Sequence, residues 1–95
     1  MKEDTSLSFS VAMSVYKNDN PVNFDRALNS ITENQTVLPN EIVLVVDGPV
    51  SDEINRIIEK YNSNFSIFKI IRLDTNAGLG NALRVAVDNS TNELI

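Results

Sequence analysis

The sequence contains no cysteine and no histidine. Without cysteine there are no disulfide bridges, thiolate metal ligands or thiol nucleophiles, and without histidine there is no imidazole for metal binding or acid–base catalysis. Carboxylates are therefore the main acid–base groups that the chain offers. The lack of cysteine is compatible with a reducing compartment but does not require one.

Long apolar runs and excess basic charge are missing as well. The longest apolar run, Ile42–Val46, is far shorter than the roughly 20 residues that cross a bilayer. The first residues lack the basic flank and apolar core of a secretory signal, so we expect a cytoplasmic location. The 8 Lys+Arg are scattered and outnumbered by 13 Asp+Glu, for a net charge of −5, which argues against a nucleic-acid partner.

The length and composition are those of a small folded domain. The chain has 95 residues, of which 42% are hydrophobic and 22% charged, an ordinary globular balance. We therefore expect residues 1–95 to form a single unit, in which residues 1–6 are a flexible tail.

Strand patterns occur in three segments. Residues 7–15 alternate between large apolar and small side chains, which is the period of a strand. Ile42–Val46 is a continuous β-branched run, typical of a parallel strand covered on both faces. Residues 67–73 predict a third strand, more peripheral because Lys69 and Arg72 interrupt it, and residues 93–95 are expected to open a fourth.

Helical spacing of apolar residues occurs between these strands. The three helices are expected to start at Asn20-Pro21 or Asn23, at Ser51 or Asp52, and near Gly78. The order β-α-β-α-β-α-(β) predicts an α/β fold with a parallel sheet and helices on its faces. With the first strand central, the second and third lie on one side and the fourth on the other, and ligands bind at such a reversal.

Candidate ligand contacts follow the first two strands. The Asp47 carboxylate could accept hydrogen bonds from a uracil imino group or ribose hydroxyls, or it could cap the next helix or form an Asx turn. Tyr16 offers a face for stacking on a base, or it covers the sheet edge. The Lys17 ammonium group could bind a phosphate, or it could simply be exposed to solvent. Asp19 and Asp74 are expected to serve turns.

The sequence NAGLG at 76–80 joins the third strand to the third helix. Its glycines allow close approach of a ligand, and its free N–H groups can face an anion, although a tightly packed turn would need the same residues. Leu83 stands where a dinucleotide fingerprint has its third glycine, and no Gly-Lys-Ser/Thr follows, so neither phosphate-binding motif is present. Arg84 is expected to pair with Asp88 rather than reach a diphosphate.

Four segments together resemble the beginning of a family 2 glycosyltransferase, in the branch that makes bacterial capsular, exopolysaccharide or lipopolysaccharide sugars. They are VAMSVYKND at 11–19, ALNSI at 27–31 leading to Gln35-Thr36, PNEIVLVVDGP at 39–49, and NAGLGNAL at 76–83. The resemblance covers nearly the whole chain from about residue 8, and four motifs in the right order are more specific than any one of them.

The resemblance implies a three-layer α/β/α, Rossmann-like half of a GT-A fold and an inverting sugar transfer from a nucleotide-diphosphate sugar, usually of uridine. The acceptor would be a saccharide or a lipid-linked saccharide, and the intact enzyme would lie in the cytoplasm or at the inner face of the membrane. The candidate nucleotide-binding residues are Ser14, Val15, Tyr16, Asp47 and Gly78. Tyr16 corresponds to the aromatic residue of the base pocket, and Asp47 to the acid that binds uracil.

The sequence also departs from the family pattern. Val46 stands where the family often has a first aspartate, and Ala82-Leu83-Arg84 replaces the common Ala-Arg-Asn, so no contact is transferred to Arg84. The family's Asp-x-Asp, which binds a divalent metal (Mg or Mn), and its catalytic base are expected beyond residue 95. We therefore expect residues 1–95, when produced alone, to transfer no sugar. We also expect them to associate with themselves.

Two alternatives stay open at this stage. One is a flavodoxin-like or receiver-like signalling domain, although a receiver needs paired acids after its first strand and Ser14-Val15-Tyr16 does not provide them. The other is a non-catalytic interaction module with the same fold.

Overall fold

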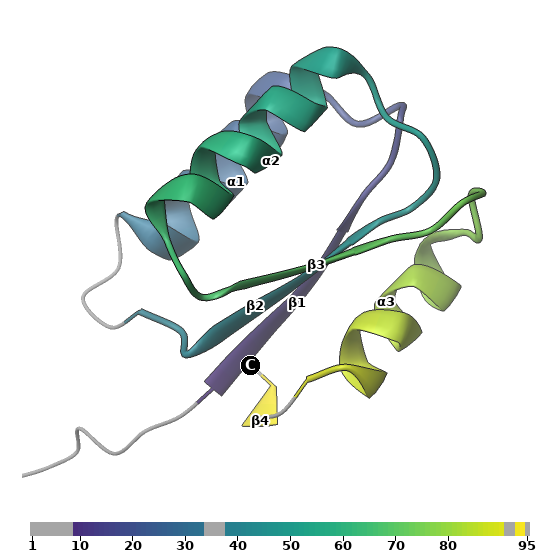
Figure 1. Ribbon diagram of the computed structural model, residues 1–95. Helices are drawn as coiled ribbons and strands as arrows, with labels where there is room; N and C mark the ends of the chain where they lie inside the picture. Colours follow the sequence, from purple (N-terminus) through teal and green to yellow (C-terminus); the bar gives the residue numbers. More distant parts are fainter. Residues whose placement is uncertain (1–8, 34–37, 91–92, 95) are drawn as a thin grey trace, which may run out of the picture.

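The computed structural model of the protein describes residues 9–33, 38–90 and 93–94 (Figure 1). Strands and helices alternate in these residues as the sequence predicts. The elements are β1 (Phe9–Val15), α1 (Pro21–Thr32), β2 (Glu41–Val46), α2 (Asp52–Asn64), β3 (Phe68–Arg72), α3 (Leu79–Asp88) and β4 (Glu93–Leu94). The expected tail at 1–6, residues 7–8 of the first predicted strand and residue 95 of the fourth lie outside the described residues.

The strands form one parallel sheet in the order β3-β2-β1-β4. This confirms that β1 is central and that the chain crosses to its other side after β3. In the register, Val15 of β1 lies opposite Val46 of β2, and Val46 lies opposite Arg72 of β3. The loops that follow these three strands therefore leave the sheet at the same end, where the carboxyl ends of the strands lie. β4 pairs only with Phe9 and Ser10, at the start of β1.

One face of the sheet is covered by α1 and α2, which lie side by side in Figure 1. Their apolar residues recur at helical spacing and meet every second residue of β1 and β2, because strand side chains alternate between faces. The buried members of this core are Val15, Phe24, Leu28, Leu44, Val46, Ile54, Ile58 and Tyr61.

The opposite face is covered by α3, which completes three layers (Figure 1). Ala82 and Ala86 of α3 are buried against Val43 and Val45 of β2. These alanines are small enough to let the helix approach the sheet closely. β2 is thus buried on both sides, as its continuous apolar run predicts, whereas β3 lies at the edge of the sheet with exposed charged residues.

The helix starts follow local signals. Asn20 caps α1, its side-chain oxygen accepting bonds from two backbone N–H groups of the first turn, and Pro21 occupies the first helical position. Ser51 caps α2, because its hydroxyl accepts the N–H of Ile54 at 3.2 Å.

In the part of the chain that the structure describes, no helix has the length and apolar character needed to cross a membrane.

Candidate functional site

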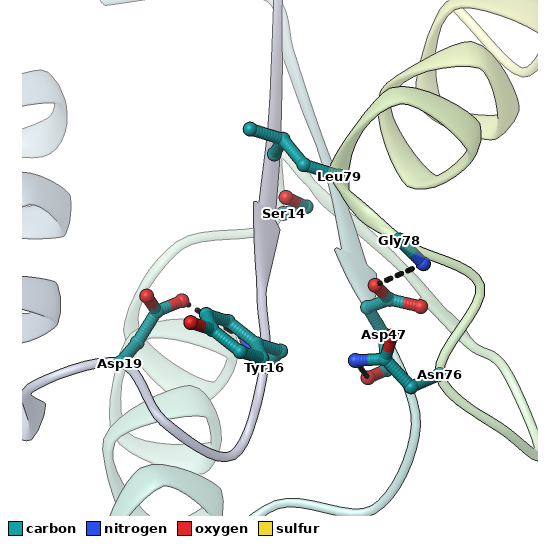
Figure 2. Close-up of a pocket in the computed structure, with 7 residues that line it drawn as sticks. All are labelled: Ser14, Tyr16, Asp19, Asp47, Asn76, Gly78 and Leu79. Carbon is teal, nitrogen blue, oxygen red and sulfur yellow. Dashed lines mark hydrogen bonds between the residues drawn. The ribbon is translucent and has the colours of Figure 1, made fainter.

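A cavity of about 400 Å³ opens at the edge of the sheet where β1, β2 and β3 end (Figure 2). The loops that follow all three strands contribute to its wall, and the first residue of α3 closes it on one side. The lining residues are Ser14, Tyr16, Asp19, Asp47, Asn76, Gly78 and Leu79. The parallel register brings these segments together although they are far apart in the chain.

Four of the five candidate nucleotide-binding residues line this cavity, namely Ser14, Tyr16, Asp47 and Gly78. Val15 does not line it, because its side chain is 1% exposed and packs in the core under α1 and α2. Only its backbone takes part in the surroundings of the site, since the Val15 carbonyl accepts the N–H of Asp47 at 2.8 Å.

Tyr16 forms one side of the cavity and belongs to a tight turn with Asp19. The Asp19 carboxylate accepts the backbone N–H of Tyr16 at 3.0 Å, and the Asp19 N–H donates to the Tyr16 carbonyl at 3.0 Å. Asp19 therefore serves a turn, as predicted, but it also lines the cavity. Figure 2 shows both side chains across from Asp47 and Asn76, and the Tyr16 side chain is 38% exposed. A planar ligand has access to this ring.

Asp47 lies at the end of β2 and is only 4% exposed. One carboxylate oxygen accepts the N–H of Ala77 at 2.6 Å and the other accepts the N–H of Gly78 at 3.1 Å, about 30 residues further along the chain. Asp47 does not cap the following helix, because Ser51 caps α2. Nor does its carboxylate form an Asx turn, since the N–H groups that it accepts belong to a distant loop. Asp47 instead provides acceptors just before α3, where Gly78 has no side chain to cap the helix.

The two loops on this side of the cavity pack tightly against each other. Gly48 has a φ of 85°, and a Cβ atom at this position would lie 2.8 Å from the backbone nitrogen of Asn76. The Asn76 side-chain amide donates to the Asp47 carbonyl at 3.3 Å. Sequence reasoning did not single out Asn76 or Leu79 as lining residues. The glycines of Asp47-Gly48 and Asn76-x-Gly78 are the sequence feature that could have indicated this contact between the two loops, because glycine allows backbones to approach closely.

The charges around the cavity are mainly negative. Its charged lining residues, among those that the structure describes, are Asp19 and Asp47. Lys17 lines a neighbouring hollow that it shares with Asp47. The expected pair of Arg84 and Asp88 is wrong: both residues are described and exposed, and no ion pair joins them. Exposed pairs one helical turn apart contribute so little energy that sequence spacing alone does not enforce them.

Residues 9–33, 38–90 and 93–94 contain no group of three or more Asp, Glu, His or Cys side chains that could hold a metal ion. The described residues therefore do not fit a metal centre.

Comparison with known proteins gives a consistent family. The sequence pattern of glycosyl transferase family 2 matches residues 10–95. The chain is 37% identical over 95 residues to the UDP-Gal:alpha-D-GlcNAc-diphosphoundecaprenol beta-1,3-galactosyltransferase of Escherichia coli, covering 100% of this chain and 34% of that protein. It is 36% identical over 87 residues to the amylovoran biosynthesis glycosyltransferase AmsE of Erwinia amylovora, covering 92% of this chain and 32% of that protein.

A further relative, an uncharacterized glycosyltransferase of Haemophilus influenzae, is 35% identical over 77 residues, which are 81% of this chain and 28% of that protein. The chain thus spans about a third of the length of the curated relatives that it matches. The match to the family pattern includes every residue that lines the cavity.

Proposed function

Because the chain belongs to glycosyl transferase family 2, we propose that it is the donor-nucleotide-binding part of a glycosyltransferase and that its cavity binds the nucleoside of a UDP-sugar. The observation that carries the proposal is the convergence of Ser14, Tyr16, Asp47 and Gly78 on one cavity. They lie at the end of β1 and in the loops after β1, β2 and β3, segments that the register of the parallel sheet brings together.

The chemistry of the lining supports a nucleoside rather than a phosphate as the occupant. Tyr16 provides a ring for stacking, Ser14 and Asn76 provide neutral polar groups, and Leu79 adds an apolar surface. The two carboxylates of the lining would repel a diphosphate, whose charges have the same sign. In the proposed complex the base and ribose occupy the cavity, and the diphosphate points out of it.

For the whole protein, we propose an inverting transfer of the donor sugar to a saccharide or lipid-linked saccharide in bacterial surface polysaccharide assembly. Support comes from two relatives, of which one is named for transfer to a diphosphoundecaprenol-linked sugar and the other for amylovoran biosynthesis. A cytoplasmic reaction, at or near the inner face of the membrane, belongs to the same proposal. The divalent metal and the catalytic base stay predictions about residues outside those described.

Isothermal titration of the intact protein with uridine, UDP and other nucleosides tests the donor proposal. We expect uridine to bind, and Tyr16→Ala to weaken its affinity on the order of 5- to 150-fold, equivalent to the roughly 1–3 kcal/mol of a base–aromatic stack. Tyr16→Phe is the matched control, because it keeps the ring and loses only the hydroxyl. A protein that binds no uridine compound, or a Tyr16→Ala variant with unchanged affinity, would contradict the proposal.

We also propose that residues 1–95 associate with themselves when produced alone. β4 pairs only with Phe9 and Ser10, so among the described residues the rest of β1 has no strand partner on that side. Leu79 and Val87 add exposed apolar surface on α3. Light scattering at micromolar concentration measures the association, and a monodisperse monomer would contradict it.

A further inference from the structure

We propose that Lys17 is a specificity-determining residue of the nucleoside site, whose ammonium group donates to the 4-carbonyl oxygen of the base and selects uracil against cytosine. This inference rests on the proposed function, with the base stacked on Tyr16 and its imino hydrogen donated to Asp47. It adds a contact from a hollow beside the cavity, which the proposed nucleoside does not otherwise use.

The cavity and this neighbouring hollow share one wall. The hollow has a volume of about 320 Å³. Its lining residues are Lys17, Asp47, Pro49, Asp74, Thr75 and Asn76. Asp47 and Asn76 also line the cavity, whereas Tyr16 lines the cavity and not the hollow, and Lys17 lines the hollow and not the cavity. A base that reaches Asp47 therefore lies at the boundary between the two spaces.

The Asp47 carboxylate keeps acceptor positions for a ligand at this boundary. An ionised carboxylate has about four of them, and the N–H groups of Ala77 and Gly78 each take one. A uracil that donates its imino hydrogen to Asp47 carries one carbonyl on each side of that nitrogen. The 2-carbonyl lies beside the bond to the ribose, which the cavity holds, so the 4-carbonyl points into the hollow.

Lys17 is the basic residue that lines the hollow, and its backbone is fixed relative to the stacking ring. It follows Tyr16 in the turn that is closed by two hydrogen bonds between Tyr16 and Asp19, both of 3.0 Å. Among the described residues, no ion pair or hydrogen bond occupies the Lys17 ammonium group. Its donors are thus available to a base that is stacked on the preceding residue.

The pattern of donor and acceptor fits uracil and opposes cytosine. Lys17 donates and Asp47 accepts, whereas uracil offers an acceptor at its 4-position and a donor at its imino nitrogen. Cytosine has an amino group at the 4-position and an unprotonated ring nitrogen beside it, so each contact would set two donors or two acceptors against each other. A site that is built to bond a polar group rejects an analogue that lacks it. Lys17 and Asp47 therefore act together in the choice of pyrimidine.

Titration calorimetry of the intact protein with uridine, cytidine and 4-thiouridine tests this role. Lys17→Met keeps the aliphatic part of the side chain and removes the ammonium group. We expect it to weaken uridine roughly 5- to 10-fold, as for one hydrogen bond from an exposed charged donor, and to leave cytidine no weaker. 4-Thiouridine should lose less than uridine, because its sulfur is a poorer acceptor. If cytidine binds neither protein, the 4-thiouridine titration decides.

A matched control and a phosphate-bearing ligand exclude other effects of the substitution. Lys69→Met removes an ammonium group that donates to the Asn89 carbonyl and lines neither space, so it should change no affinity. If Lys17 bound a phosphate instead, Lys17→Met would weaken UDP and leave uridine unchanged. A lysine that contacts the base weakens both ligands by the same factor.

The outcomes separate the role of Lys17 from the nucleoside site itself. Unchanged uridine affinity in Lys17→Met, or an equal loss for uridine and 4-thiouridine, would overturn the assignment of Lys17 while the site stands. A wild-type protein that does not bind uridine would overturn the nucleoside site, and the role of Lys17 with it.

Discussion

Replacing Gly48 by alanine is expected to lower the free energy of unfolding, whereas the same replacement at Gly80 is expected to leave it unchanged or raise it. The chemical change is one methyl group in both cases. The two sites differ in backbone conformation and in the space around the added Cβ. Gly48 has a φ of 85°, and its Cβ would lie 2.8 Å from the Asn76 nitrogen, whereas Gly80 lies within α3 with nothing within 4 Å.

The magnitudes follow from these two differences. A left-handed backbone costs a residue with a side chain roughly 1–2 kcal/mol. The contact at Gly48 involves backbone atoms, so it is relieved only by moving the loop, which weakens a charge-assisted bond to Asp47 that contributes about 1.5–3 kcal/mol. We expect Gly48→Ala to cost about 2–4 kcal/mol in total. Gly80→Ala should gain up to about 1 kcal/mol from helix propensity.

Gly78→Ala separates the two contributions, because Gly78 has a φ of 93° but an added Cβ would meet nothing within 4 Å. Its φ of 93° and ψ of 154° lie in a region that is almost exclusive to glycine, so its expected cost is this backbone term alone, about 1–3 kcal/mol. Urea denaturation followed by far-ultraviolet circular dichroism measures all three variants, since the chain has no tryptophan to serve as a fluorescent probe. Equal effects at Gly48 and Gly80, or a Gly48→Ala variant as stable as the wild type, would refute the close approach of the two loops.

Three further predictions concern the core and the contact between α1 and α2. Leu28→Ala removes a fully buried side chain and should lower the unfolding free energy by about 2–5 kcal/mol in the same urea assay. Tyr61→Phe removes the 3.1 Å bond to the Asp25 carbonyl and should cost about 0.5–1.5 kcal/mol, with a larger loss pointing to disturbed packing. The hydrogen bond from Lys60 holds the pKa of Asp25 below 3.8, so this pair stabilises the fold above that pH and stops doing so as the pH falls through the lowered pKa. The melting temperature of Asp25→Asn should accordingly lie slightly below that of the wild type at pH 7 and converge with it in acid, and a difference that widens on acidification would contradict the sign.

Local sequence patterns were enough to predict the elements and their order. The continuous apolar run of β2 predicted burial on both faces, because only a strand between two helical layers can keep such a run out of water. The starts of α1 and α2 lie at Asn20 and Ser51, each one of the two positions predicted for that helix, because capping involves backbone groups only two or three residues away. The position of β1 inside the sheet followed from the alternation of strands and helices together with the handedness of crossovers.

The partners of individual side chains were decided by the tertiary structure. Asp47 lines the cavity, as its place after β2 predicts, but its carboxylate also accepts two N–H groups from a loop about 30 residues away, which no local pattern indicates. Val15 was predicted to bind the nucleotide together with Ser14 and Tyr16, but the alternation of β1 turns its side chain into the core. Arg84 and Asp88 have the spacing of a pair and do not form one. Periodicity is a local property of the chain, whereas the acceptor that a given N–H finds depends on which loops the register of a parallel sheet brings to the same edge.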